Sequence, residues 1–398
     1  MSAMPSNGAD QPLSLEHLQR LTDSFGIVQH ASHSIPDYRT GYTTDDNARA
    51  LVVAVKHYRA HGDDLSRKLA ARYLAFLLFA RRPEGRFHNF IGFERKPLDD
   101  VGSEDCFGRA MWALAWVLLA PSEPGLIGPA QQMLYEGLPW IPRLEHPRGR
   151  AFCITALHRW ALARPEQLAQ VQELTRPLAD YLVGRYREHS RPDWDWLLPE
   201  MTYANAKLPE ALFRAYQITQ QEQYLDVARR TMRFLCEKTF VDDALCLVGN
   251  HGWYRHGSEE PPLYDQQPID ASAMVEAALA GFDATSDPTD LRRAWIALEW
   301  FFGRNRQGAS LYDAQTGGCF DGLTEHGVNQ NRGAESTICL LLSQLSVLDA
   351  RHRISRRALG MPPTEEDQYA GIEEESAEIS YARQAAFMPP APTREPRG

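Results

Sequence analysis

The stretch GYTTDDNARAL, residues 41–51, decides the fold because it contains a polar helix start followed directly by the small and apolar residues of a buried helix. Its polar tetrapeptide, Thr44-Asp45-Asp46-Asn47, contains residue types preferred at helix N-termini, where their side chains accept hydrogen bonds from free backbone N–H groups. Ala48, Ala50 and Leu51 follow, and small residues among larger apolar ones suit a helix packed between neighbours. The stretch therefore predicts an inner helix with an acidic start.

The same pattern, a polar or acidic residue opening a helix rich in Ala and Leu, occurs six times along the chain. The starts are 59, 47, 51, 67 and 65 residues apart, which leaves room for two helices and a loop in each unit. Regular spacing of this kind indicates a repeated supersecondary unit. The six segments begin at Asp46, Asp105, Phe152, Tyr203, Asp270 and Glu335.

Longer amphipathic segments lie between these starts and predict outer helices with one charged face. They cover about 12–23, 66–81, 124–141, 165–189, 222–240 and 287–304. Six inner and six outer helices make an (α/α)₆ toroid, with a superhelical solenoid as the alternative. The number six and the polar inner-helix starts favour the closed ring, because closure directs every start toward one mouth.

Long connections precede the inner helices, and loops of this length in a compact domain are usually functional. Strand-forming residues around turns predict small β-hairpins at 244–250 and 310–321. We expect a flexible N-terminus over 1–11, the toroid over 12–355 and a largely disordered tail over 356–398, with a short helix at 374–386.

Composition restricts the partners and the location. The chain of 398 residues has a net charge of −10, which argues against a nucleic-acid partner and favours neutral or cationic ligands. No apolar run approaches the roughly 20 residues of a membrane helix, and the polar start, Met1 to Gln11, lacks the apolar core of a signal peptide. We therefore expect a cytoplasmic protein without a membrane span.

Six scattered cysteines without a CxxC pair predict buried thiols, with neither a disulfide nor a zinc site. Spacings of His and Asp match no recognised metal loop, and the chain has no GxSxG elbow, HExxH motif or nucleotide-binding glycine fingerprint. We expect no metal and no cofactor.

Acidic groups gather at the predicted mouth. Asp45 and Asp46 are adjacent, which tends to separate their pKa values into those of an acid and a base, although capping alone also explains them. A second pair, Glu104 and Asp105, opens the next inner helix after a loop that also carries Asp99 and Asp100. Capping explains one carboxylate of such a run, but not four.

Aromatic and amide groups accompany these acids. Trp194 and Trp196 flank an aspartate, and an exposed Trp face stacks on sugar C–H groups, although a buried Trp at a helix contact is the alternative. Further polar and aromatic residues precede the last inner helices, in a mixture that suits polyhydroxyl recognition. For each single residue, capping is at least as good an explanation as catalysis.

The longest motifs resemble a bacterial toroid family that is often identified only as glycosyltransferase-associated, and that occurs fused to or beside retaining glycosyltransferases and mannoside phosphorylases. The resemblance covers roughly residues 20–350 and implies a glycan ligand, with a glycosyltransferase as a further partner. It lies in GIVQHASHSIPDYRTGYTTDDNARAL, RFHNFIGFERKPLDDVGSEDCFGRAMWAL, TYANAKLPEAL, GNHGWY, DQQPIDA, YDAQTGGCFDG and GVNQNRGAEST.

A looser similarity connects the chain to α-mannanase toroids, which place an Asp-Asp pair at the start of an inner helix as nucleophile and acid/base. Carried over to this sequence, that similarity makes Asp45 and Asp46 the pair. Only the dipeptide and its position on the helix match.

These observations favour a glycoside hydrolase acting on a mannose- or glucose-containing oligosaccharide through paired carboxyl groups. A sugar epimerase or isomerase using His30, His88, His251 and His326, and a non-catalytic glycan-binding partner of a glycosyltransferase, are the alternatives. The predicted catalytic carboxyl groups are Asp45, Asp46, Asp105, Asp270 and Glu335. The predicted substrate-binding residues are His30, Tyr42, Arg49, Glu104, Trp194, Trp196, Tyr203, Asn205, Trp253, Gln267, Asp321 and Asn331.

Overall fold

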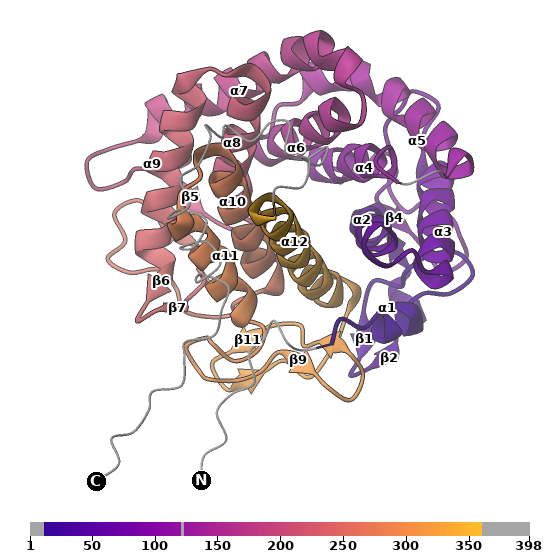
Figure 1. Ribbon diagram of the computed structural model, residues 1–398. Helices are drawn as coiled ribbons and strands as arrows, with labels where there is room; N and C mark the ends of the chain where they lie inside the picture. The colour runs from indigo at the N-terminus through magenta and orange to yellow at the C-terminus, as the bar shows by residue number, and fades with distance from the viewer. Residues whose placement is uncertain (1–11, 121–122, 360–398) are drawn as a thin grey trace.

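The computed structural model describes residues 12–120 and 123–359. Within these residues six helices form an inner ring and six others pack outside it (Figure 1). The inner helices are α2 (Thr44–His61), α4 (Glu104–Val117), α6 (Pro147–Ala163), α8 (Lys207–Thr219), α10 (Pro268–Thr285) and α12 (Ala334–Ala358). The outer helices are α1 (Glu16–Leu21), α3 (Asp64–Ala80), α5 (Pro124–Gly137), α7 (Leu168–His189), α9 (Glu222–Thr239) and α11 (Pro288–Glu299).

The inner ring is closed. Each inner helix contacts the next one along the chain, and α12 contacts both α10 and α2 (Figure 1). A solenoid would leave the first and last helices apart, so the predicted (α/α)₆ toroid is confirmed.

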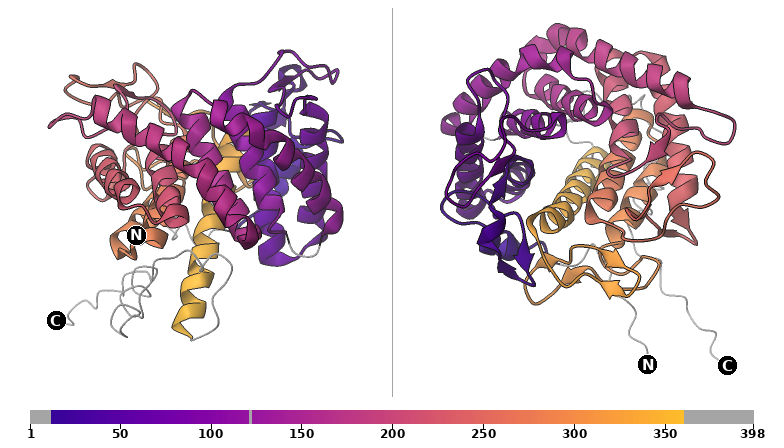
Figure 2. Two further views of the ribbon diagram at one scale, coloured as in Figure 1. Left: turned by 90° about the horizontal axis from the view of Figure 1, so that it is seen from above. Right: turned by 180° about the vertical axis from the view of Figure 1, so that it is seen from behind.

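Side-chain contacts show that the neighbouring inner helices α2 and α12 run in one direction. Arg49 of α2 reaches Glu335 at the start of α12, whereas Lys56 near the end of α2 reaches Ser346 farther along α12. We call the side with the N-terminal ends the mouth and the opposite side the rear face. The longest helix, α12, extends past the ring on the rear side (Figure 2).

Capping defines the helix starts as the sequence predicts. The Thr43 hydroxyl accepts a hydrogen bond from the Asp46 N–H at 3.0 Å, and the Ser103 hydroxyl accepts one from the Cys106 N–H at 3.2 Å. Gly62, with φ of 66°, ends α2 in the left-handed conformation that glycine adopts without strain.

Two of the inner helices begin away from their predicted starts. The third begins at Pro147, five residues before Phe152, because proline suits the first turn, where its missing N–H is not needed. The fourth begins at Lys207, so that Tyr203 lies in the preceding loop. The tail helix predicted at 374–386 and the flexible segment 1–11 lie outside the described residues.

Short strand pairs join the mouth loops. The hairpin predicted at 310–321 is confirmed as β9 with β10. Ala244–Leu245, by contrast, pairs as β7 with the preceding strand β6, which directly follows α9. The pairs are β1 (Ala31–Ser32) with β2 (Ile35–Pro36), β3 (Tyr42–Thr43) with β4 (Phe90–Ile91), β5 (Glu200–Met201) with β8 (Tyr254–Arg255), β6 (Phe240–Val241) with β7 (Ala244–Leu245), β9 (Tyr312–Asp313) with β10 (Gly318–Cys319), and β11 (Leu323–Thr324) with β12 (Gly327–Val328).

The described helices include none that combines the length and the apolar character needed to cross a bilayer. All six cysteines lie in the described part of the chain as free thiols, five of them buried and Cys246 partly exposed. Burial of the thiols is thus confirmed at five positions.

Candidate active site

Arg49 connects two carboxyl groups at the mouth. Its guanidinium lies one turn into α2 and contacts Asp46 Oδ1 at 2.8 Å and Glu335 Oε2 at 3.0 Å. Asp46 and Arg49 are buried, whereas the Glu335 side chain is 41% exposed. Burial raises the pKa of Asp46, and Arg49 opposes this shift. Because Asp46 also accepts a hydrogen bond from the Thr43 hydroxyl at 2.6 Å, this carboxyl group holds Arg49 in place.

Asp45 pairs with a residue of the neighbouring helix. Arg109 of α4 places Nη1 3.0 Å from Asp45 Oδ2, and its guanidinium lies 4.9 Å from the centre of the Phe152 ring. Arg109 is 5% exposed and Asp45 19% exposed in their side chains, so the carboxylate faces the mouth while the cation lies behind it.

The second acidic helix start forms a hydrogen-bonded chain with the loop before α8. The Tyr203 hydroxyl donates to Asp105 Oδ2 at 2.8 Å, while Arg148 Nε donates to the Tyr203 carbonyl at 2.8 Å and stacks its guanidinium on the Tyr203 ring. Burial and the Asp105 charge raise the pKa of Tyr203 to about 12, so the hydroxyl stays protonated and acts as a donor.

Asp270 lies in the first turn of α10 in a different environment. It is buried, and its Oδ1 accepts a hydrogen bond from the Asn205 N–H at 3.4 Å. Among the described residues, no side chain donates a hydrogen bond to it within bonding distance. Burial is the main cause that raises its pKa to about 7, and the negative charge of Glu335 adds to the shift. Asp270 can therefore hold a proton near neutral pH.

Below these groups the ring encloses a central cavity of about 390 Å³ that is open to solvent. Its wall combines cationic and aromatic side chains with one buried acid. The residues that matter here are Arg49, Arg109, Trp112, Phe152, Lys207 and Glu276. Within the described chain, no group of three or more His, Cys, Asp or Glu side chains is arranged to hold a metal ion.

Comparison with solved structures identifies relatives in fold. A cellobiose 2-epimerase from Bacillus thermoamylovorans matches 83% of this chain and 95% of its own, with a TM-score of 0.64 and 11% identity. A D-mannose isomerase matches 84% of this chain and 96% of its own, with a TM-score of 0.65 and 13% identity. A family 76 α-mannanase from Bacteroides thetaiotaomicron matches 79% of this chain and 88% of its own, with a TM-score of 0.56 and 11% identity.

The (α/α)₆ toroid is shared by all three. Identities this low establish the common fold and leave the reaction open. No protein-family model matches the chain, and no curated protein matches it in sequence.

The structure corrects three predicted binding residues. Trp194 and Trp196 are 1% and 0% exposed, so the prediction of exposed sugar platforms is wrong. Trp194 packs edge-on against Phe234, because the loop before α8 folds back onto α9. Tyr42 is also buried, and its hydroxyl donates to Asp23 Oδ2 at 2.6 Å, away from the carboxyl groups of the mouth.

Two further predicted residues hold loops in place. Glu104 accepts hydrogen bonds from the backbone N–H groups of Glu145 and His146 and so fixes the entry to α6. Asp321 accepts hydrogen bonds from the Gly333 N–H and the Ser336 hydroxyl, both at 2.6 Å, and so caps α12. These bonds occupy carboxylate oxygens that the sequence assigned to substrate.

The remaining predicted residues lie in or beside the mouth loops. Asn331 Oδ1 accepts a hydrogen bond from the His33 N–H at 2.9 Å, which ties the first mouth loop to the last. His30 is exposed, Trp253 and Gln267 are partly exposed, and Asn205 is buried with its side chain bonded within its own turn. Substrate binding by these residues stays a prediction.

The sequence interpretation missed the cations. Arg109, Arg148 and Lys207 all face the mouth or the central cavity. A signal for Arg109 is present, because Asp105 and Arg109 repeat the spacing of Asp45 and Arg49. An Asp and an Arg four residues apart place both side chains on one helix face.

Proposed function

We propose that this protein is a carbohydrate-active enzyme that hydrolyses a glycosidic bond in a mannose- or glucose-containing oligosaccharide. Such a reaction needs one carboxyl group that gives a proton to the leaving oxygen and a second carboxylate that acts as base or nucleophile. The fold likeness to an α-mannanase and to sugar epimerases supports a sugar substrate.

The contrast between Asp270 and its neighbours carries the proposal. Asp45 and Glu335 each contact an arginine, whereas Asp270 is buried without such a partner and its pKa is raised to about 7. Two carboxyl groups whose environments separate their pKa values can divide the roles of acid and base. We assign the acid role to Asp270.

Glu335 is the best placed base or nucleophile. Its side chain is 41% exposed at the mouth, and the contact with Arg49 orients it. Its charge contributes to the raised pKa of Asp270, which lies in the first turn of the neighbouring inner helix, α10. The hydrogen-bonded pair of Asp105 and Tyr203 then positions sugar hydroxyl groups.

Epimerisation or isomerisation of a sugar is the second candidate. A cellobiose 2-epimerase and a D-mannose isomerase match this chain with TM-scores of 0.64 and 0.65. A pair consisting of a neutral acid and a carboxylate can also remove and return a proton next to a sugar carbonyl group. The same residues would then serve a different reaction.

Proton NMR on a panel of mannose and glucose disaccharides, oligosaccharides and monosaccharides distinguishes hydrolysis from epimerisation. New reducing-end signals support hydrolysis, whereas a change of configuration at C2 without cleavage supports epimerisation. Asp270→Asn should abolish turnover, and Asp64→Asn on the outer surface of α3 should leave it intact. Binding across the panel without any turnover would contradict both enzymatic proposals and favour a glycan-binding partner of a glycosyltransferase.

A further inference from the structure

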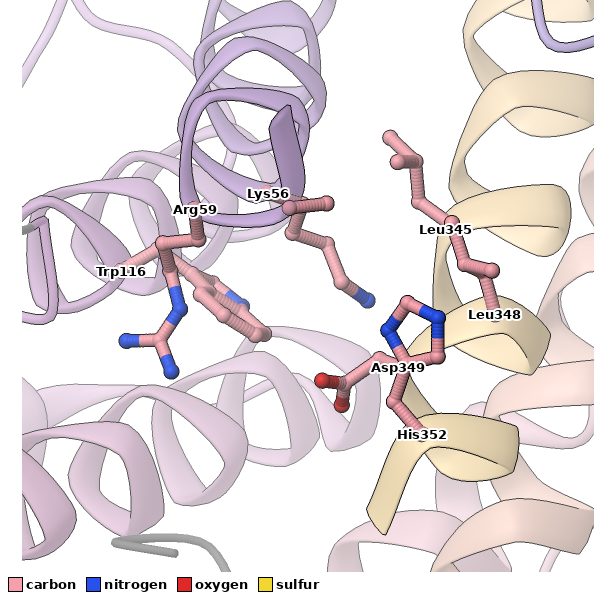
Figure 3. Close-up of a pocket in the computed structure, with 8 residues that line it drawn as sticks. Lys56, Arg59, Trp116, Leu345, Leu348, Asp349 and His352 are labelled. Atoms are coloured by element: carbon pink, nitrogen blue, oxygen red, sulfur yellow. The ribbon is translucent and has the colours of Figure 1, made fainter. Parts of the chain in front are cut away.

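A second cavity lies at the opposite end of the ring from the carboxyl groups. It has a volume of about 560 Å³, including space open to solvent, and lies between the last turns of α2, the end of α4 and the second half of α12 (Figure 3). The side chains around it are Lys56, Arg59, Trp116, Leu345, Leu348, Asp349 and His352, together with Ala60. We call it the rear cavity.

The wall of the rear cavity is cationic although the protein as a whole has a net charge of −10. Lys56 and Arg59 of α2 are positively charged, and His352 lies across from them on α12 (Figure 3). One carboxylate, Asp349, also faces the cavity, but Arg353 Nε lies 3.5 Å from its Oδ2. Among the groups that line the cavity, two cations thus stand against one carboxylate, although Lys56 also pairs with Glu276 behind the wall.

The rear cavity also has a hydrogen-bond donor without a partner. The indole N–H of Trp116 is buried, and it has no hydrogen-bond partner among the described residues. Lys56 Nζ lies 4.8 Å from the centre of the same ring, so cation and indole share one side of the cavity. A buried N–H group without an acceptor is costly, which a ligand oxygen would relieve.

Helix ends account for only part of the positive charge. Basic side chains stabilise the C-terminal ends of helices through the helix dipole, and Arg59 does so by donating to the Leu119 carbonyl at 2.6 Å. Lys56 is different because it lies more than one turn before the end of α2 and is only 7% exposed. Its burial is accounted for by Glu276, whose Oε1 lies 3.6 Å from Lys56 Nζ, and by the Ser346 hydroxyl, to which Lys56 donates.

We propose that the rear cavity binds a small molecule through a phosphate group. The three oxygens of a phosphate monoester can accept hydrogen bonds from Lys56 on α2, from the Trp116 indole on α4 and from His352 on α12. Leu345 and Leu348 contact the less polar remainder of the ligand. Inorganic phosphate and a phosphorylated sugar are the two sources of this group.

An ion pair lies between the rear cavity and the central one. Lys56 Nζ lies 3.6 Å from Glu276 Oε1, and Ser346 bridges both groups. Glu276 also lines the central cavity, on the other side of this pair. A phosphate that draws Lys56 toward the rear therefore changes the charge that Glu276 presents to the central cavity.

Isothermal titration calorimetry of the full chain tests the proposal with inorganic phosphate, glucose 6-phosphate and glucose. We expect saturable binding of one or both phosphates and none of glucose at the rear cavity. His352→Ala should weaken phosphate binding about tenfold, because one of the three proposed hydrogen bonds is lost, while Arg351→Gln at the same end of α12 should not. The ligand that binds more tightly shows whether the cavity prefers inorganic phosphate or a phosphorylated sugar.

A second pair of variants tests the shape of the rear cavity without changing any charge. Ala60→Trp places a large side chain at the cavity and should abolish binding, whereas Ala71→Trp on the exposed side of α3 should leave it unchanged. Equal affinity in all four variants, or no saturable binding up to about 10 mM phosphate, would overturn the proposal. These titrations need no substrate, so their result is independent of the proposed hydrolysis.

Discussion

Arg49 Nη1 lies 3.0 Å from Glu335 Oε2, although 286 residues separate the two in the chain. The contact joins the first inner helix to the last, and it places a cation beside a carboxylate at the mouth. Since Arg49 also contacts Asp46 at 2.8 Å, one side chain stabilises the ring closure and sets the charge of the site.

Replacement of Arg49 by methionine should destabilise the fold. Asp46 would remain buried without its cation, and breaking a buried ion pair by removing one partner costs about 3–5 kcal/mol. Urea unfolding followed by circular dichroism measures the difference. Arg67→Met, at an exposed ion pair on α3, is the control and should change little. Equal stability of the two variants would show that Asp46 does not depend on Arg49.

Asp270 should make the stability of the protein depend on pH. Its pKa is about 7 in the folded chain, against an ordinary value near 3.8, so the folded state holds the proton more tightly. The associated stability is present in full below about pH 4 and is lost as the pH rises through 7. A shift of about three units corresponds to up to about 4 kcal/mol.

Asp270→Asn removes this dependence. The free energy of unfolding of the variant, minus that of the wild type, should be larger at pH 8 than at pH 5. Urea unfolding of both proteins at the two pH values measures this difference. A constant difference between wild type and variant would mean that Asp270 titrates with an ordinary pKa. Under the proposed hydrolysis, kcat/KM of the wild type should also fall above about pH 7, because the acid loses its proton.

Tyr203→Phe tests the hydrogen bond to Asp105. The hydroxyl is protonated over the working pH range, so its removal leaves the carboxylate without this donor. We expect kcat/KM on a cleaved oligosaccharide to fall about tenfold, with little change in Tm. Tyr135→Phe, on outer helix α5, is the matched control. A loss of Tm without a loss of activity would assign Tyr203 a purely structural role.

Thiol labelling should report the burial of the cysteines. Burial raises the pKa values of the thiols of Cys106, Cys153, Cys236, Cys319 and Cys339, so these groups stay protonated and shielded. We expect Ellman's reagent to modify Cys246 alone in the folded protein and all six after denaturation. Cys246→Ser should abolish the native reaction, and rapid labelling of that variant would contradict the burial pattern.

Much of the fold could be predicted because its elements depend on local patterns. The capping residues before α2 and α4 and the amphipathic period of the outer helices are properties of short segments. The Ala and Leu pattern places the start of α6 five residues late, because the helix begins at Pro147, before that pattern sets in. Ring closure was inferred from the count of helices, and the contact of α12 with α2 confirms it.

The site was predictable in its location and less so in its contacts. Acidic helix starts gather at one mouth, as expected, but the partner of each acid comes from another helix, as with Asp45 and Arg109. Sequence spacing does not reveal such pairs. Trp194 and Trp196 show the same limit, because a tryptophan in a long loop can turn outward or pack inward, and only the path of the loop decides.

The seam between α2 and α12 has a consequence for synthesis on the ribosome. When α2 emerges, the first residue of α12, which will cover its flank, is still 273 residues away (334 − 61), so that flank is exposed to solvent. Apolar surface exposed in this way promotes aggregation of nascent chains. On the side of α2 that faces α12, however, lie Arg49 and Lys56. Their charges favour hydration of this surface until α12 is synthesised and supplies Glu335 and Ser346 as partners.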